Sequence, residues 1–138
     1  MQALAREHRR ELGLPILAIT GSNGKTTTKE LVSRVLAEKY EVYATRGNLN
    51  NHIGVPLTLL AMTRDVEFGI VEMGASACGE IALLCSIAEP NYGIVTNIGR
   101  ATWKASAARR VSGAGKASCT TGSPGPEGAF SFLPTTRS

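Results

Sequence analysis

A short apolar segment at residues 14–20, LPILAIT, leads directly into the glycine-rich stretch GSNGKT and then into a helical pattern. β-Branched residues in a short apolar run are typical of a buried parallel strand. The segment 27–40 then carries apolar residues at helical spacing, namely Leu31, Val32, Val35 and Leu36. A strand, a glycine turn and a helix in that order favour folds in which parallel strands are connected through helices.

The same alternation continues along the chain. The patterns predict further strands at 41–45, 66–74 and 92–99, and further helices at 2–12, 55–63 and 78–89. Strand–helix alternation of this kind predicts a parallel sheet that is covered on both faces. We therefore expect an α/β fold, a partial P-loop-type three-layer sandwich with a mostly parallel sheet, over residues 14–101.

This order stops after Arg100. Residues 102–138 are rich in Ala, Gly, Ser, Thr and Pro and show no hydrophobic period, so we expect this tail to be disordered. The basic and acidic residues of 1–100 balance, and the net charge of +4 falls in 101–138. A nucleic-acid partner would depend on this tail, which has no patterned basic face, so none is expected.

Location and redox state follow from simple absences in the sequence. No apolar run approaches the roughly 20 residues of a membrane span. The first thirteen residues, MQALAREHRRELG, have no apolar core of a signal peptide, so a cytoplasmic protein is expected. Cys78, Cys85 and Cys119 have no metal-ligand spacing and are interpreted as free thiols.

The loop after the first strand has the composition of a phosphate-binding loop. Gly21 and Gly24 permit backbone conformations and a close approach that a side chain would block. Lys25 can reach the β- and γ-phosphates of a nucleotide, and Thr26 can place a hydroxyl on Mg²⁺. Backbone N–H groups and the helix dipole attract phosphate, so the candidate nucleotide contacts are Gly21, Ser22, Asn23, Gly24, Lys25, Thr26 and Thr27. The spacing GxxGKT is shorter than the full GxxxxGKT motif, and an ordinary strand-to-helix turn is the alternative.

Other polar residues follow the expected strands. Glu72 lies near the end of the segment 66–74, where a carboxylate could hold Mg²⁺ or could simply be solvated. Asn48, Asn50 and Asn51 crowd one loop, which is either a plain turn or a polar lining around phosphate or substrate.

Two further polar residues are expected at the same edge of the sheet. His52 lies in the same loop as the asparagines and is given no catalytic role. Asn97 follows the fourth expected strand and lies on the same edge of the sheet, with the same two interpretations as the asparagine loop.

Four segments in this order, TGSNGKTTTKE, NLNNHIGVPLTLL, VEMGAS and VTNIGRA, resemble the Mur ligase family over about residues 2–101. The triple threonine followed by KE, and the NLNN loop, favour the branch that adds D-alanyl-D-alanine to UDP-N-acetylmuramoyl-tripeptide over its sister enzymes and over folylpolyglutamate synthase. The resemblance implies a three-domain, ATP-dependent ligase of peptidoglycan synthesis. Such an enzyme activates a substrate carboxylate as an acyl phosphate, which the incoming amine attacks.

The resemblance also implies roles for particular residues. It makes Lys25, Asn50 and Asn51 catalytic candidates. It assigns the loop 21–27 and Asn97 to ATP, and Thr26 and Glu72 to Mg²⁺. The intact enzyme is expected to be a monomer with UDP-N-acetylmuramoyl-tripeptide and D-alanyl-D-alanine as substrates, and with no membrane partner.

The chain departs from the family pattern at both ends. Residues 1–13 are expected to be a linker helix, with the UDP-substrate domain and the C-terminal domain absent. The family continues after NIGRA with a His-Leu-Glu-Gly-like segment, whereas this chain has Thr102, Trp103, Lys104 and Ala105. Restoring one cytosine before the codon of Thr102 permits His, Leu and Gly and requires Glu. We therefore expect 102–138 to be an out-of-frame translation.

Two interpretations of function stay open. The chain is either the ATP-binding core fragment of such a ligase or a non-catalytic, nucleotide-binding remnant. We expect at most very weak nucleotide binding and no ligase turnover by this chain alone. A P-loop kinase or GTPase-like switch would require base-recognition motifs and an aspartate-based metal strand, and the sequence has neither.

Overall fold

The structure, a computed structural model, describes residues 1–76 and 79–97. The elements run in the order α1 (Gln2–Leu12), β1 (Ile16–Thr20), α2 (Lys25–Ala37), β2 (Val42–Ala44), α3 (Gly54–Leu60), β3 (Phe68–Glu72), α4 (Glu80–Ala88) and β4 (Tyr92–Val95). The expected disorder and frameshift of residues 102–138 lie outside the described residues.

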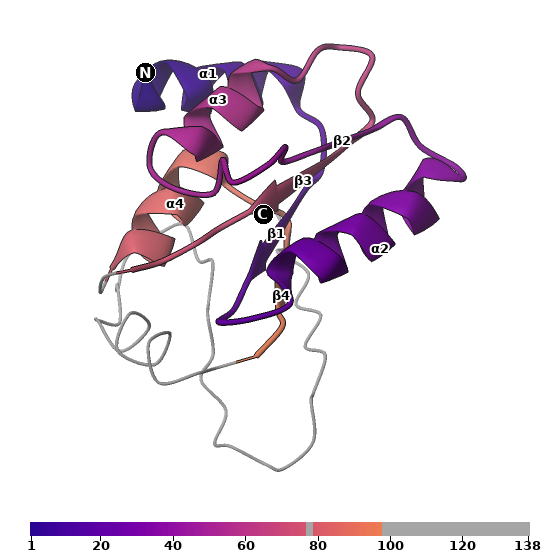
Figure 1. Cartoon of the computed structure of the whole chain (residues 1–138). Coiled ribbons are helices and arrows are strands. Elements are labelled where there is room, and N and C mark those ends of the chain that lie inside the picture. Colours follow the sequence, from indigo (N-terminus) through magenta and orange to yellow (C-terminus); the bar gives the residue numbers. More distant parts are fainter. Residues whose placement is uncertain (77–78, 98–138) are drawn as a thin grey trace.

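The four strands form one sheet in the order β2-β3-β1-β4, and every described pairing is parallel (Figure 1). In the register of the central strand, Ala18 lies opposite Val71 of β3 and Gly93 of β4. The expectation of a parallel α/β fold is confirmed.

Helices cover both faces of this sheet. Helix α2 lies against β1, β2 and β3 on one face, while α1, α3 and α4 pack together on the other (Figure 1). Because side chains alternate along a strand, Ile16 and Ala18 of β1 join the core beneath α3 and α4. Leu17 and Ile19 join the smaller core beneath α2. The three-layer arrangement is therefore present.

The helix after the glycine loop begins earlier than its apolar pattern indicates. It was expected at 27–40 and spans Lys25–Ala37, directly after Gly24. It ends early because the chain closes into a turn, in which the amides of Lys39 and Tyr40 both donate to Leu36 O, at 3.1 and 2.9 Å.

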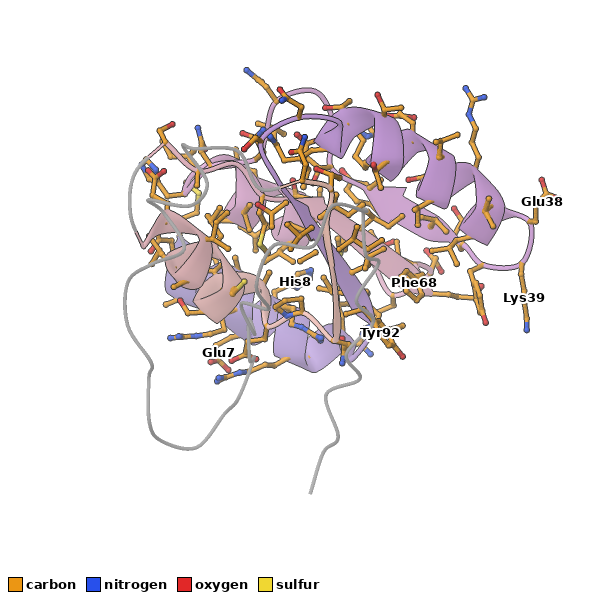
Figure 2. The ribbon with its side chains drawn as sticks, turned by 90° about the horizontal axis from the view of Figure 1, so that it is seen from below. Glu7, His8, Glu38, Lys39, Phe68 and Tyr92 are labelled. Atoms are coloured by element: carbon orange, nitrogen blue, oxygen red, sulfur yellow. The ribbon has the colours of Figure 1, made fainter. Side chains whose placement is uncertain are left out.

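Contacts at the other end of the sheet join α1 to the body of the domain. His8 points from α1 toward the interior, and its Nε2 lies 2.9 Å from Met62 O (Figure 2). The rings of Phe68 and Tyr92, at the first positions of β3 and β4, stack with centroids 6.3 Å apart.

The assignment of residues 1–13 as a linker stays a prediction. None of the helices in the described ranges has the length and apolar character needed to cross a bilayer.

Candidate functional site

The loop between β1 and α2 presents free backbone donors at the start of a helix. Gly24 precedes α2 with φ of 78°, a left-handed conformation that glycine adopts without strain. Within the described part of the chain, the amides of residues 24–27 have no hydrogen-bond acceptor. Unpaired N–H groups at the positive end of a helix dipole form a binding site for an anion such as phosphate.

Lys25 lies beside these donors. Its Nζ donates to Gly21 O at 2.8 Å, so the side chain folds back over the loop that it follows. This contact gives the ammonium one neutral acceptor, and no carboxylate of the described residues forms an ion pair with it. The ammonium therefore retains donors for a phosphate group.

A buried carboxylate lies next to the start of α2. Glu72, at the end of β3, is only 2% exposed. Its Oε2 accepts a hydrogen bond from Thr26 Oγ1, and its Oε1 accepts one from Asn50 Nδ2, each at 3.1 Å. None of the described lysines or arginines forms an ion pair with it. A buried carboxylate that has only neutral partners is suited to receive a cation.

Thr26 Oγ1 and Glu72 Oε2 lie at about the spacing of adjacent Mg²⁺ ligands. Adjacent ligands of an octahedral Mg²⁺ lie about 2.9 Å apart, because each oxygen is ~2.0–2.1 Å from the ion. Thr26 Oγ1 and Glu72 Oε2 are 3.1 Å apart. No group of three or more His, Cys, Asp or Glu side chains gathers in the described ranges. An ion here would therefore take its remaining ligands from phosphate or water.

The asparagines of the loop 48–51 make different contacts. Asn50 reaches Glu72, whereas Asn51 Oδ1 accepts hydrogen bonds from the amides of Ile53 and Gly54, at 3.0 and 2.9 Å, at the start of α3. Asn48 contributes its carbonyl to the turn, where it accepts from the Asn50 amide at 2.8 Å. The structure thus brings Asn50 to the carboxylate, whereas the side chain of Asn51 bonds to the amides where α3 begins. The catalytic roles of both residues stay predictions.

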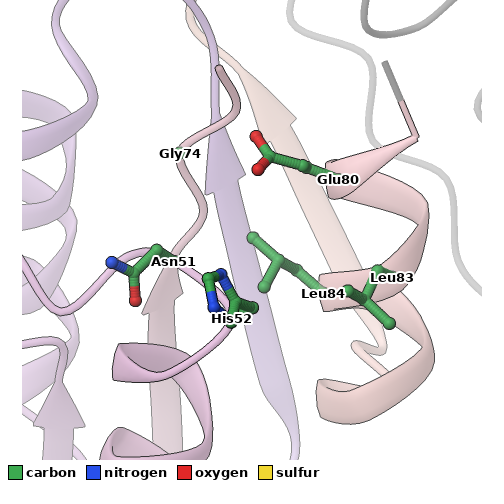
Figure 3. Close-up of a pocket in the computed structure, with 6 residues that line it drawn as sticks. All are labelled: Asn51, His52, Gly74, Glu80, Leu83 and Leu84. Atoms are coloured by element: carbon green, nitrogen blue, oxygen red, sulfur yellow. The ribbon is translucent and has the colours of Figure 1, made fainter. Parts of the chain in front are cut away.

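A small pocket lies beside this loop. It is lined by Asn51, His52, Gly74, Glu80, Leu83 and Leu84 (Figure 3). None of these residues belongs to the glycine loop, and Glu72 is not among them. The glycine loop and the Glu72 carboxylate therefore lie outside this pocket.

Asn97 lies on the glycine loop itself. Its Oδ1 accepts hydrogen bonds from the amides of Ser22 and Asn23, both at 2.9 Å. The loop is therefore divided, because residues 22 and 23 bond within the protein while residues 24–27 remain open. The structure brings Asn97 to the candidate site through the loop, and a direct contact with nucleotide stays a prediction.

Close packing of the segment 96–97 explains the first glycine. Gly21 has φ of 137°, and a Cβ atom there would lie 3.0 Å from Asn97 N. Thr96 Oγ1 also donates to Asn23 O at 2.6 Å. Sequence analysis missed Thr96, and its place after β4, at the same edge as Asn97, is the signal that could have indicated it.

Sequence analysis also missed two buried residues behind Glu72. Thr45 is 1% exposed and Lys29 is 3% exposed. Thr45 Oγ1 accepts from the Glu72 amide at 2.9 Å, and Lys29 Nζ donates to Thr45 O at 2.8 Å. The position of Thr45 directly after β2 was a usable signal, but Lys29 was indistinguishable from a solvated helix residue.

The cysteines are only partly described. Cys85 is half-buried, and its Sγ lies 3.8 Å from Met73 Sδ. Cys78 and Cys119 lie outside the described residues.

A parallel sheet with a glycine loop opening into a helix, and a buried carboxylate at the neighbouring strand end, define an α/β domain of the P-loop type. Comparison with known families gives the narrower assignment. The family described as the Mur ligase middle domain matches residues 19–102, and the chain belongs to it.

Curated relatives and solved structures agree with this assignment. UDP-N-acetylmuramoyl-tripeptide--D-alanyl-D-alanine ligase of Bacillus subtilis (strain 168) is 52% identical over 99 residues, which are 72% of this chain and 22% of that protein. The same-named ligase of Synechocystis is 50% identical over 100 residues, with the same coverage. This chain thus spans about a fifth of the length of these relatives.

Among solved structures, MurF from Acinetobacter baumannii superimposes with a TM-score of 0.70 at 38% identity, covering 74% of this chain and 23% of that one. MurF ligase from Thermotoga maritima in complex with ADP gives a TM-score of 0.64 at 40% identity, covering 73% and 24%. The fold of the described residues is therefore that of part of these ligases.

Proposed function

We propose that residues 14–101 are the nucleotide-binding core of a ligase that joins D-alanyl-D-alanine to UDP-N-acetylmuramoyl-tripeptide in peptidoglycan synthesis. The observation that carries this proposal is the pairing of the buried Glu72 with Thr26 at the start of α2, beside the open amides of residues 24–27. The names of the relatives support the substrates, and the ADP complex of a structural neighbour supports the nucleotide.

In this proposal the residues of the loop bind and orient the terminal phosphates of ATP. The amides of residues 24–27 and the Lys25 ammonium donate to phosphate oxygens. Thr26 and Glu72 would hold Mg²⁺, which supplies neutralisation of phosphate charge. Asn50 keeps the Glu72 carboxylate oriented through its contact with Oε1.

The proposed reaction proceeds through an acyl phosphate. An oxygen of the tripeptide carboxylate forms a bond to the γ-phosphorus as the bond to the β-phosphate oxygen breaks and ADP leaves. The amine of D-alanyl-D-alanine then attacks the acyl carbon, inorganic phosphate leaves with the C–O electron pair, and the proton lost by the amine nitrogen ends on that phosphate. Holding the phosphates and the cation in fixed positions is the contribution that this domain makes.

We also propose that this chain alone does not complete that reaction. The family match ends at residue 102, where the codon pattern supports a change of reading frame. Sequencing of the genomic locus tests the frame. A good frame beside codon 102 is expected, and an intact coding region without one would contradict it.

A calorimetric titration of the full chain with ATP, with and without Mg²⁺, tests nucleotide binding. Wild-type chain should bind Mg²⁺–ATP, and Lys25→Met should bind roughly 10- to 100-fold more weakly, because a charge-assisted hydrogen bond is worth about 1.5–3 kcal/mol. Lys39→Met is the matched control, since Lys39 lies beyond the far end of α2 (Figure 2). Absence of binding by wild-type chain, or equal binding by Lys25→Met, would refute the nucleotide site.

A phosphate-release assay with both substrates then separates an active ligase from a nucleotide-binding remnant. The expected result is nucleotide binding without turnover. Turnover at an ordinary enzymatic rate would contradict the second proposal and leave the first intact.

A further inference from the structure

Two buried side chains lie behind the proposed cation site and touch neither the loop amides nor the carboxylate. We infer that Thr45 and Lys29 are positioning residues that fix Glu72 relative to Thr26, and that they thereby make the site selective for Mg²⁺ over the larger Ca²⁺. This inference rests on the proposed function for its ligand, but not for its geometry.

Thr45 holds the backbone of Glu72 in place. Its Oγ1 accepts a hydrogen bond from the Glu72 amide at 2.9 Å, and its own amide donates to Ile70 O at 2.9 Å. Thr45 lies beyond β2, where the ladder between β2 and β3 ends at Ala44 and Ile70. The hydroxyl therefore continues the connection between the two strands up to the residue that carries the carboxylate.

Lys29 ties helix α2 to the same point. It lies one turn after Thr26 on α2, and its Nζ donates to Thr45 O at 2.8 Å. Two hydrogen-bonded connections thus join α2, which supplies Thr26, to β3, which supplies Glu72. One connection is the direct contact between the two side chains, and the other runs through Lys29 and Thr45.

A buried lysine is a costly way to pack a helix. Lys29 is 3% exposed, and the one carboxylate that pairs with it among the described residues, Glu30 at 3.1 Å, has a side chain that is 59% exposed. An apolar side chain of similar length would fill this space without the cost of removing a charge from water. What an apolar residue could not supply is a directional hydrogen bond to Thr45 O, which fixes the helix in position along the strand ends.

The rigidity of the two ligands is what distinguishes the two cations. The observed separation of 3.1 Å between Thr26 Oγ1 and Glu72 Oε2 lies between the ~2.9 Å of adjacent Mg²⁺ ligands and the ~3.3 Å of a six-coordinate Ca²⁺, so the distance itself does not select an ion. Mg²⁺ demands a near-ideal octahedral geometry, whereas Ca²⁺ accepts six to eight oxygens in flexible arrangements. Loosening the two ligands should therefore weaken Mg²⁺ binding more than Ca²⁺ binding.

ADP affinity of the full chain, measured in Mg²⁺, in Ca²⁺ and in EDTA, tests the inference. Thr45→Val removes the hydroxyl, Thr45→Ser retains it, and Lys29→Met removes the bond to Thr45 O. Thr58→Val is the matched control, because Thr58 is 2% exposed and its hydroxyl donates to Gly54 O within α3.

We expect Thr45→Val and Lys29→Met to lose roughly 10- to 100-fold of the Mg²⁺-dependent gain in affinity, the range found when a group that orients a metal ligand is removed. Binding in EDTA should stay the same, and the preference for Mg²⁺ over Ca²⁺ should shrink. Thr45→Ser and Thr58→Val should behave like wild type. An unchanged Mg²⁺-to-Ca²⁺ ratio in both Lys29→Met and Thr45→Val would overturn the inference, as would an equal loss in all three media.

Hydrogen exchange of the Glu72 amide without ligand separates this inference from the proposed function. Thr45→Val should exchange this amide faster, and Thr45→Ser should protect it. If wild-type chain binds no nucleotide while this pattern holds, the proposed function fails and the positioning geometry stands. If Thr45→Val leaves the exchange unchanged, the positioning geometry fails whatever the chain binds.

Discussion

The two ends of the sheet use buried polar side chains in opposite ways. Where β1 begins, Arg9 is 6% exposed and donates to Ala88 O, Glu89 O and Asn91 Oδ1, at 3.0, 3.2 and 2.8 Å. Asn91 Oδ1 also accepts from the amide of Ile16 at 2.9 Å. Every one of these contacts is made within the protein, so this end joins α1 to the turn between α4 and β4.

At the opposite end, charged groups and backbone donors have hydrogen-bonding positions that the described residues do not fill. There Glu72 has two neutral donors, Lys25 has one carbonyl acceptor, and the amides of residues 24–27 have no acceptor in the described ranges. A fold gains nothing in stability by leaving charges and donors in this state. The difference separates the end that stabilises the domain from the end that we propose binds nucleotide.

The largest expected effect is a loss of cation-dependent binding on replacing Glu72. Glu72→Gln should lose about 100-fold of the Mg²⁺-dependent gain in ADP affinity, because a cation ligand is removed. The free energy of unfolding should stay equal or rise, since glutamine removes a buried charge that has no ion-pair partner among the described residues. Calorimetry and urea unfolding measure both. Glu67→Gln, just before the other end of β3, is the control that should change neither.

Replacing Arg9 should lower the stability of the fold and leave nucleotide binding unchanged. Arg9→Met removes three hydrogen bonds and should lower the free energy of unfolding by about 2 kcal/mol. Nucleotide affinity of the folded protein should be unchanged. Arg64→Met, at an exposed ion pair with Glu11, should stay within about 0.5 kcal/mol of wild type. A loss of Mg²⁺-dependent binding in folded Arg9→Met would remove the distinction between the two ends.

Asn97 lies at the proposed nucleotide site, but its hydrogen bonds are made within the protein and stabilise the loop that we propose binds phosphate. Asn97→Ala should lower ADP affinity about 10-fold, since two amide hydrogen bonds worth roughly 1 kcal/mol each no longer hold the loop. Asn97→Asp should retain the folded stability but also bind ADP more weakly, through repulsion of phosphate. Tighter binding by Asn97→Ala would mean that Asn97 occupies the phosphate position.

The smallest effect concerns pH at the stabilising end. The side-chain hydrogen bonds from Arg10, at 3.0 and 2.6 Å, hold the pKa of the Glu89 carboxyl below its usual 4.5. Since the folded-state pKa lies below the unfolded value, this contribution is present above about pH 4.5 and is lost as pH falls through the folded-state pKa. Urea unfolding of wild type and Glu89→Gln should therefore differ slightly at pH 6 and converge toward pH 3. A difference that grows as the pH falls would contradict this sign.

Local patterns were enough to predict the strands, the loop and the position of Glu72. The apolar run before the glycines predicts β1, and the carboxyl ends of parallel strands share one edge, which places Glu72 near Thr26. The bounds were less accurate, because turns such as the one at Lys39 and Tyr40 end an apolar pattern early. The strand order, with β3 between β2 and β1, has no local signal.

What the sequence did not indicate are contacts between distant segments. Asn97 and Thr96 bond to a loop more than seventy positions earlier in the chain. Lys29 lies in a segment, KTTTKE, in which a lysine is ordinarily solvated, and it is buried where α2 packs against the sheet. Such contacts depend on the whole fold and cannot be derived from a helical period.

Titration of the full, ¹⁵N-labelled chain with Mg²⁺–ADP, followed by nuclear magnetic resonance, tests most directly whether the loop before α2 binds phosphate. The amide signals of residues 24–27 should shift most, and those of Ser22 and Asn23 should shift less because they are already bonded to Asn97. Lys25→Met should strongly reduce the shifts at equal concentration. Largest shifts elsewhere, such as around His52 and Glu80, or no shifts in residues 24–27, would contradict it.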